Sequence, residues 1–297
     1  MIKELIRPII SHRLVNLVVV SILKVVKPLV PMELLVRVPI YGRVTCGLAD
    51  SKTLTMYSQA DDVMVSGLCF QGLESYEQES IDLFRGLASR ASSILDVGAN
   101  TGIYSLVAAI ENPLSKVYAF EPVPRIFNRL EQNRDINNAA NVQLNQSVIA
   151  DFNGSTTLYI PTGKIPTSSS TAAGHRRAVE TIEVNATSLD SFIELEGISK
   201  VDLMKIDTES TEPLVLDGAL KMIERDRPTI VCEVLRPRTG KALRKILDNF
   251  GYQYYWITPN GLIKQDRPIG DPEFKYLNYL FIQPDKISNI GAQIISA

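Results

Sequence analysis

The feature that most constrains the fold is an alternation, from about residue 90 onward, of short β-branched runs with segments of helical periodicity. We expect strands at 94–97, 116–121, 141–148, 201–206 and 229–235, with helices at 102–111, 213–223, 241–249 and one beginning near Pro124. This order is typical of βαβ units and a parallel sheet. Two last strands, 252–258 and 276–283, have no helix between them, which predicts an antiparallel pair that closes the sheet.

Between residues 141 and 201 the pattern is less regular. Asn153-Gly154 predicts a tight turn into a strand at 156–160, consistent with a hairpin. Residues 161–178 are rich in Ser, Thr, Gly and Pro without an apolar period, so they predict a long loop of the kind that often forms a lid. No internal repeat and no interdomain linker is visible.

The composition excludes several classes of function. A chain of 297 residues with 45% hydrophobic and 22% charged residues is globular, and 31 Lys and Arg against 33 Asp and Glu gives no basic excess for nucleic acid. Cys46, Cys69 and Cys232 lie far apart, which argues against a disulfide framework and a cysteine zinc site and favours the cytoplasm. Two histidines exclude a poly-histidine metal centre, and no G-x-S-x-G elbow of a serine hydrolase is present.

The amino-terminal region differs from the rest of the chain. We divide the chain into a helical extension over 1–60 and one domain over 61–297. Residues 1–45 carry seven basic and two acidic residues, and their uncharged run, 14–23, is too short to span a bilayer. A helix here gathers apolar side chains on one face: Val15, Val18, Val19, Ile22 and Val26. That face predicts packing on the chain's own domain or in a homodimer; the alternative is a peripheral anchor on the cytoplasmic membrane surface.

The strongest chemical signal is ILDVGANTG at 94–102, where the first strand turns into a helix. Gly98 and Gly102 allow the backbone to pass close beneath a ligand. Asp96 ends the first strand, at the edge where open α/β sheets bind ligands, and its carboxylate can pair with a cationic amine. Glu121 ends the second strand, where an acid can accept hydrogen bonds from both ribose hydroxyls.

Two cofactors suit an acid at the ribose position, a nicotinamide dinucleotide and S-adenosylmethionine. Dinucleotide sites use G-x-G-x-x-G, whereas this turn has G-x-x-x-G with Asn100 inside it. Asp96 has no use beside a pyrophosphate but suits the ammonium of a methionine group. We therefore favour S-adenosylmethionine; the structural alternative is that both acids only cap helices.

These motifs resemble the FkbM-type class I methyltransferases. The resemblance rests on ILDVGANTGIYSLVAA (94–109), AFEPVP (119–124), VDLMKIDTESTEPLVLDGA (201–219) and NYLFI (278–282), preceded by SYEQESIDLFRGL (75–87). It implies a Rossmann-like three-layer α/β sandwich with a seven-stranded, mostly parallel sheet and an antiparallel last strand. It also implies methyl transfer to a hydroxyl of a carbohydrate, glycolipid or secondary metabolite. The cofactor positions it implies are Asp96, Gly98, Ala99, Asn100, Thr101, Gly102, Glu121, Pro122, Ser147 and Val148.

Three acids follow the middle strands and are the candidate catalytic residues: Asp207, Glu209 and Glu233. One is expected to act as the base for the acceptor hydroxyl and another to orient it. A divalent metal held by their oxygens is an alternative that we do not favour, and a structural role, capping the Pro213 helix or pairing with Lys205, is another. The family usually has Glu-Gly where this chain has Glu209-Ser210. This difference affects what the resemblance implies about the substrate more than what it implies about the cofactor.

The loop at 161–178 holds the remaining candidates. His175 titrates near neutral pH and is a candidate catalytic base on a lid. Arg176 can hold a phosphate or uronic acid, and Ser169 and Ser170 can bind sugar hydroxyls. Trp256 and the tyrosines at 252, 254 and 255 predict sheet packing rather than a sugar platform. Alternatives for the whole protein are a methyltransferase acting on nitrogen or carboxylate, and a non-catalytic cofactor-binding partner.

Overall fold

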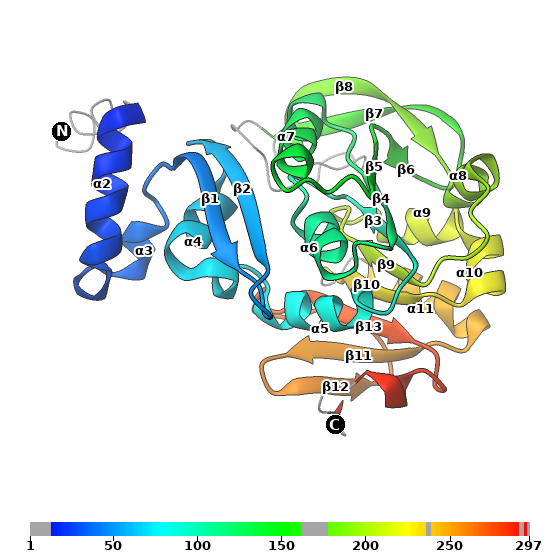
Figure 1. Ribbon diagram of the computed structural model, residues 1–297. Coiled ribbons are helices and arrows are strands. Elements are labelled where there is room, and N and C mark those ends of the chain that lie inside the picture. The colour runs from blue at the N-terminus through cyan, green and yellow to red at the C-terminus, as the bar shows by residue number, and fades with distance from the viewer. Residues whose placement is uncertain (1–12, 162–177, 236–238, 291–293, 296–297) are drawn as a thin grey trace.

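The computed structural model describes residues 13–161, 178–235, 239–290 and 294–295 (Figure 1). The main sheet has the order β14-β12-β11-β13-β10-β9-β3-β4-β5. Its strands are β3 Ser93–Val97, β4 Lys116–Phe120, β5 Val142–Asn145, β9 Leu203–Ile206, β10 Thr229–Glu233, β11 Gln253–Thr258, β12 Gly261–Gln265, β13 Asn278–Ile282 and β14 Ile294–Ile295. Strands β5, β4, β3, β9 and β10 are parallel, and β13 is antiparallel to both neighbours. The order from β5 to β11 is the expected Rossmann-like α/β arrangement with β13 antiparallel, but the described sheet has nine strands rather than seven, because β12 and β14 extend it beyond β11.

Helices cover both faces of this sheet, which makes three layers (Figure 1). Successive strand residues point to opposite faces, so Ile94 and Leu95 of β3 belong to different core clusters. One cluster includes α5 Gln78–Ala88 and α6 Ile103–Glu111, beside α7 Pro124–Ile136. The other includes α8 Leu189–Glu196, α9 Glu212–Asp217, α10 Leu220–Asp226 and α11 Gly240–Leu247. Burial on both faces explains why the central strands read as continuous apolar runs.

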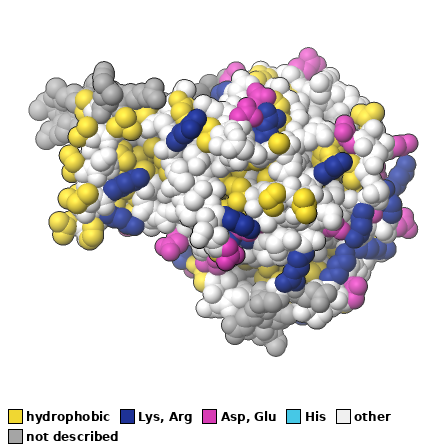
Figure 2. Space-filling view, in the orientation of Figure 1, with side chains coloured by type: hydrophobic (Ala, Val, Ile, Leu, Met, Phe, Trp, Pro, Cys, Tyr) yellow, Lys and Arg dark blue, Asp and Glu magenta, His cyan; other side chains and the backbone are white. Residues whose placement is uncertain are grey.

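Helix α2 Arg13–Val25 lies at one end of the molecule, followed by η1 Lys27–Leu29 and α3 Met32–Leu35. Its inner face is held by Asn16, whose amide donates to the Pro39 carbonyl (2.6 Å). Val18 and Ile22 point outward and are exposed, and Figure 2 shows hydrophobic side chains gathered at this end. The expected packing of this apolar face on the chain's own domain is therefore wrong in the described structure, because the face built around Asn16 docks instead. No described helix is long and apolar enough to cross a membrane.

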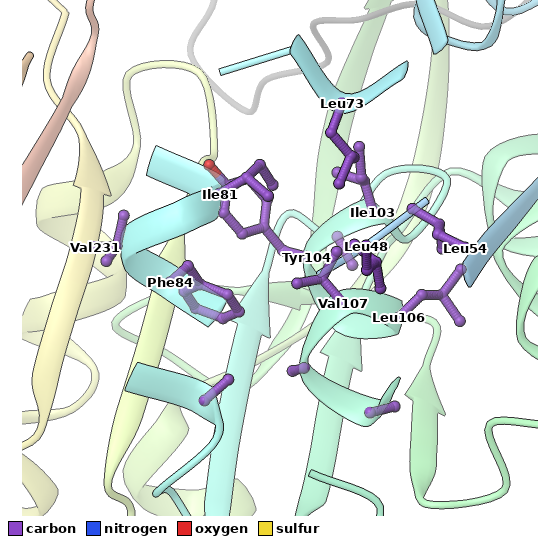
Figure 3. Close-up of a cluster of buried hydrophobic side chains, with 14 of the residues drawn as sticks. Leu48, Leu54, Leu73, Ile81, Phe84, Ile103, Tyr104, Leu106, Val107 and Val231 are labelled. Carbon is purple, nitrogen blue, oxygen red and sulfur yellow. The ribbon is translucent and has the colours of Figure 1, made fainter. Parts of the chain in front are cut away.

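The expectation of a wholly helical extension is also wrong. Residues 41–59 form an antiparallel hairpin of β1 Tyr41–Gly47 and β2 Thr53–Gln59, with alternating burial along each strand. Figure 3 shows Leu48 and Leu54 from this hairpin beside Leu106 of α6, in one core cluster. The hairpin thus shares its core with the main sheet layer, and the division at residue 60 stays a prediction.

Side chains of α7 pair the outer edge of β2. The Asn137 amide accepts from Thr55 N (2.8 Å) and donates to Thr55 O (2.6 Å). Asn133 accepts from Tyr57 N (2.8 Å), and Arg129 donates to Tyr57 O (2.9 Å) and to both carboxylate oxygens of Asp61. Because an open strand edge leaves backbone groups unpaired, these side chains take the place of a third strand. Asp61 then leads into α4 Val63–Gln71 and η2 Gly72–Ser75.

A second small sheet, in the order β6-β8-β7, corrects two expectations. The predicted strand at 141–148 is split, because β5 ends at Asn145 and β6 Val148–Ile149 belongs to the small sheet. The predicted hairpin into residues 156–160 is wrong as well: β7 Gly154–Pro161 pairs with β8 Ala178–Thr187, a strand that the sequence pattern missed. The intervening residues 162–177 lie outside the described residues.

The predicted helix at 213–223 is two short helices, α9 and α10, with Gly218 between them. A Cβ on Gly218 would lie 2.0 Å from the Ala150 carbonyl oxygen. The glycine between the two helices therefore leaves room for the chain that follows β6 to pass beside them. Strand β12 was missed; its register, Thr258 opposite Gly261, leaves a two-residue turn after β11. The tyrosines at 252, 254 and 255 are buried in the sheet, as expected, and the Trp256 indole donates to the Tyr276 carbonyl (2.8 Å).

The turns that follow strands β3 and β9 are in direct contact. The Asp207 amide donates to the Val97 carbonyl (2.9 Å). A Cβ on the next residue, Gly98, would lie only 1.8 Å from the Asp207 carbonyl oxygen, and Gly98 has φ +84°. Only glycine fits here without moving the backbone.

Gly98→Ala should therefore destabilise the fold by at least about 3 kcal/mol, because left-handed backbone strain adds to a backbone overlap. Gly86→Ala is the matched control: Gly86 lies in α5 with open space around it, and alanine there should stabilise by about 0.5–1 kcal/mol. Urea unfolding measures both. Equal stability of the Gly98→Ala variant and the wild type would contradict the contact.

Candidate active site

A cleft of about 1100 Å³, measured to its open mouth, lies at the carboxyl ends of β3, β4 and β9. All ten residues expected at the cofactor line it: Asp96, Gly98, Ala99, Asn100, Thr101, Gly102, Glu121, Pro122, Ser147 and Val148. Asp207 and Glu209 line it too. The ends of adjacent parallel strands meet at one edge of the sheet, which is why motifs far apart in sequence share one cleft.

The turn between β3 and α6 departs from ordinary backbone geometry. Gly98, Asn100 and Gly102 have φ of +84°, +50° and +100°. A Cβ on Gly102 would lie 2.4 Å from Cδ1 of Leu130. Each glycine makes room for the protein itself, Gly98 for the turn after β9 and Gly102 for α7; that they also let a ligand approach the backbone stays a prediction.

Glu121 holds this turn from the neighbouring strand. One carboxylate oxygen accepts from Asn100 N (3.1 Å) and the other from Val123 N (2.9 Å). Burial and, to a smaller extent, the nearby Asp96 raise the pKa of Glu121, whereas these two hydrogen bonds lower it, and the result is about 7 overall. A ligand that donates hydrogen bonds to this carboxylate would stabilise its charged form.

Asp96 is buried at the end of β3 and accepts a hydrogen bond from the Ser105 hydroxyl (2.5 Å). Burial raises the pKa of Asp96 to about 6, while Ser105 and Lys205 lower it. Asp96 and Glu121 are thus two buried acids in one cleft, each weakened by burial. Such perturbed acids are typical of functional sites.

Another part of the cleft wall comes from residues 62–76, to which the sequence reasoning assigned no role at the site. Asp62 caps α4 by accepting from Met64 N (2.9 Å), and it also accepts from the Thr101 hydroxyl (3.2 Å). Asp62, Met64 and Tyr76 all line the cleft. An aspartate before an apolar run signals a helix cap, but nothing in the sequence showed that this cap reaches the glycine turn.

Lys205 is the central cation of the site. It is 1% exposed, and its ammonium lies 3.1 Å from Asp207 Oδ2, 3.1 Å from Asn278 Oδ1 and 4.8 Å from the ring centre of Tyr104. Burial by itself lowers the pKa of Lys205, but Asp207, Glu77 and Glu233 raise it above its ordinary value. A permanent positive charge therefore sits beside Asp207.

Glu77 joins this cluster from the start of α5, although 128 residues of sequence separate it from Lys205. Its carboxylate accepts from the Tyr104 hydroxyl (2.6 Å) and from the Asn278 amide (2.8 Å). Burial raises the pKa of Glu77, Lys205 lowers it and Asp207 raises it. Glu77 and Asn278 lie in two segments that carry the family resemblance, 75–87 and 278–282, but the sequence reasoning assigned neither of them a role at the site.

Glu233 ends β10 and is buried, and its Oε2 has no hydrogen-bond partner among the described residues. Burial and then Asp207, Glu209 and Glu212 raise the pKa of Glu233 well above its ordinary value. Glu233 does not line the cleft as Asp207 and Glu209 do. The catalytic role expected for Glu233 stays a prediction.

The turn after β9 brings Glu209 to the cleft mouth. Glu209 and Ser210 have φ of +54° and +85°, so serine occupies a left-handed position that suits glycine better. Glu212 holds the turn: one oxygen accepts from Thr208 N (3.1 Å) and Ser210 N (3.0 Å), and burial raises its pKa to about 7. The structural alternative is met in part by Asp207, which pairs with Lys205, while the residue that holds the turn before Pro213 is Glu212, which the sequence reasoning did not select.

Several predicted residues cannot be placed. His175, Arg176, Ser169 and Ser170 lie outside the described residues and stay predictions. Among the residues that the structure describes, no group of three or more His, Cys, Asp or Glu side chains is arranged to hold a metal ion.

The cleft combines three chemical capacities. Asp96 and Glu121 can receive a ligand that carries a cation and hydroxyl donors, and they would repel a pyrophosphate. Apolar walls come from Phe120, Val148 and Ile149. Asp207, held by Lys205 and partly open to the cleft, can accept a proton or a hydrogen bond from a second molecule.

Curated relatives match part of this chain. Methyltransferase 1 of Beauveria bassiana (strain ARSEF 2860) is 28% identical over 145 residues, 43% of this chain and 58% of that protein. The 31-O-demethyl-FK506 methyltransferase FkbM of Streptomyces tacrolimicus is 28% identical over 152 residues, 42% of this chain and 58% of that protein. The chain thus matches less than two thirds of the length of these relatives. A solved FkbM methyltransferase from Methylobacillus flagellatus KT covers 74% of this chain and 54% of its own, at 13% identity and a TM-score of 0.43.

A family model gives the broader match. The model of the Methyltransferase FkbM domain matches residues 96–254, more than half of the chain. The matched region begins at Asp96 and includes Glu121, Asp207 and Glu233. The protein belongs to the FkbM methyltransferase family.

Proposed function

We propose that this protein is an S-adenosylmethionine-dependent O-methyltransferase that acts on a hydroxyl of a carbohydrate, glycolipid or secondary metabolite. The observation that carries the proposal is the pair of buried acids, Asp96 and Glu121, beside the ion pair of Lys205 and Asp207 in one cleft. The first pair suits the cofactor and the second pair suits the acceptor. Family membership supports the reaction class.

The residues of the cleft fit S-adenosylmethionine. Glu121, with its raised pKa, gains from hydroxyl donors such as those of a ribose, and Asp96 gains from an ammonium group. Ala99, Asn100 and Pro122 line the floor between these acids, and Ser147 and Val148 line the side toward the small sheet. When bound, the cofactor supplies an activated methyl group on a sulfonium.

Asp207 performs the acid–base work in this proposal. Lys205 keeps the Asp207 carboxylate paired at 3.1 Å, so its other oxygen can receive the proton of an acceptor hydroxyl that approaches from the cleft. Glu209, which lines the cleft, orients the acceptor, and Glu233, whose pKa is raised by burial and then by Asp207, ends the neighbouring strand β10. His175, Arg176, Ser169 and Ser170 are proposed for the acceptor side.

One relative supports oxygen as the acceptor atom. The name of the Streptomyces tacrolimicus protein describes methylation of a 31-O-demethylated compound. Transfer to nitrogen or to a carboxylate is the competing outcome, and labelled-methyl transfer to sugar, polyketide-alcohol, amine and carboxylate acceptors separates the classes. Labelling of amines or carboxylates alone would contradict the proposal.

The cofactor is tested first by calorimetric titration. S-adenosylhomocysteine should bind and NAD should not. Glu121→Ala should weaken S-adenosylhomocysteine binding about 10- to 100-fold, because it removes hydrogen bonds to a charged group. Glu224→Ala, on the exposed side of α10, is the control. Binding of NAD, or equal affinity of both variants, would overturn the cofactor assignment.

The catalytic role of Asp207 gives a second prediction. Asp207→Asn should lower the rate of methyl transfer about 10²- to 10⁴-fold with little change in S-adenosylhomocysteine affinity, since asparagine still accepts from Lys205 but takes no proton. Asp217→Asn, an exposed aspartate at the end of α9, should leave the rate unchanged. A rate for Asp207→Asn within experimental error of the wild type would remove Asp207 from the mechanism.

The raised pKa values give a third prediction, of pH dependence. In the ligand-free protein the Glu121 pKa is about 7 and the Asp96 pKa about 6, and a cationic, hydroxylated ligand favours the ionised forms. Each proton that must leave on binding costs about tenfold in affinity per pH unit below the pKa. The affinity for S-adenosylhomocysteine should therefore fall as the pH drops from 7.5 to 5.5.

Calorimetry in buffers of different ionisation enthalpy measures the protons released. Glu121→Gln, which does not titrate, should show a weaker pH dependence. An affinity that is constant or rises toward pH 5.5 would show that neither acid faces the ligand.

A further inference from the structure

The amino-terminal end of the molecule carries an apolar surface that no described residue covers. Val18, Ile22 and Val25 are 60%, 56% and 80% exposed and follow one another at helical spacing on the outer side of α2. Val15 lies on the same side of the helix, and two exposed leucines follow it in the chain, Leu29 and Leu34. We call these six residues the α2 patch.

Helix α2, which carries most of the α2 patch, is fixed to the rest of the protein through its inner face. On the inner face Asn16 donates to Pro39 O (2.6 Å) and accepts from Tyr41 N (3.3 Å), while Val20 and Leu23 pack against the core. The helix is thus fixed on the β1–β2 hairpin with its apolar side outward. Contiguous apolar surface of this kind marks an interaction site.

Basic side chains accompany the α2 patch in the same stretch of chain. Lys24 and Arg37 are exposed and Lys27 is half-buried, whereas Glu33 is the one acid among residues 13–43. Lys24 projects from the flank of α2 toward Cys69 of α4, and Lys27 and Arg37 follow the helix. Figure 2 shows Lys and Arg side chains beside the hydrophobic ones at this end of the molecule. A second copy of the chain, docked by a two-fold axis on this patch, would place these cations against each other. An anionic lipid surface would instead pair with them while the apolar side chains enter the head-group region.

We propose that the α2 patch binds the surface of an anionic lipid bilayer, with α2 lying in the plane of the interface. The proposal is independent of the methyl-transfer chemistry. Apolar burial and attraction between the basic residues and the anionic head groups both contribute, so binding requires both and weakens with salt.

Vesicle flotation of the full chain tests the proposal, with vesicles of phosphatidylcholine alone or mixed with phosphatidylglycerol. The wild type should float with the mixed vesicles at least about tenfold more than with the neutral ones, and less at high salt. Ile22→Glu combined with Val25→Glu should abolish flotation. Leu114→Glu combined with Leu195→Glu, which changes two highly exposed leucines away from α2, should not.

S-adenosylhomocysteine binding and thermal unfolding check that the variants are folded, and size-exclusion chromatography with light scattering gives their oligomeric state. Lys24→Gln with Lys27→Gln should lower flotation with the mixed vesicles only. Absence of wild-type flotation, or flotation that the Ile22/Val25 change does not affect, would overturn the proposal. So would a wild-type dimer that this change dissociates, since the patch would then be a protein interface.

Discussion

The site depends on the contact between the turns that follow β3 and β9. Gly98 lies so close to the Asp207 carbonyl that a single methyl group would overlap it. This contact brings the carboxyl ends of β3 and β9 together. It places Asp96, at the end of β3, near Asp207 in the turn after β9. A main-chain hydrogen bond to Val97 then positions Asp207, and the carboxylate of Glu121 accepts from the main-chain amide of Asn100. The geometry of the cleft follows from the backbone before any ligand arrives.

Burying so many acids in one place is unfavourable, and the structure compensates only in part. Lys205 offsets Asp207 and Glu77 directly, and the Tyr104 ring covers its ammonium. Asp96, Glu121, Glu212 and Glu233 remain with raised pKa values. An unbalanced electrostatic field of this kind reduces the stability of the ligand-free protein and favours a cationic ligand.

The sequence predicted the central sheet well because parallel strands buried on both faces leave an unmistakable apolar pattern. It also predicted the residues that line the cofactor side of the cleft, since Asp96 and Glu121 are tied to strand ends by short-range geometry. It failed where tertiary contacts decide: it left β8, which pairs with β6 and β7, unassigned, and it missed the β1–β2 hairpin, which joins no larger sheet among the described residues and is held by side chains of α7. For the same reason the sequence analysis missed three residues of the site, Glu77, Asn278 and Asp62. Only the tertiary fold brings them to Lys205 or Thr101. The roles of the catalytic and acceptor residues stay predictions.

One amide joins regions that the sequence keeps far apart. The Asn133 side chain accepts from Tyr57 of the hairpin and donates to the Thr101 carbonyl (2.8 Å) in the glycine turn. Cutting the chain at the start of the matched family domain would leave this amide, Arg129 and Asn137 without their partners in β2. A fragment of residues 96–254 would keep the bond from Asn133 to the glycine turn but lose the hairpin contacts that hold the other side of this amide.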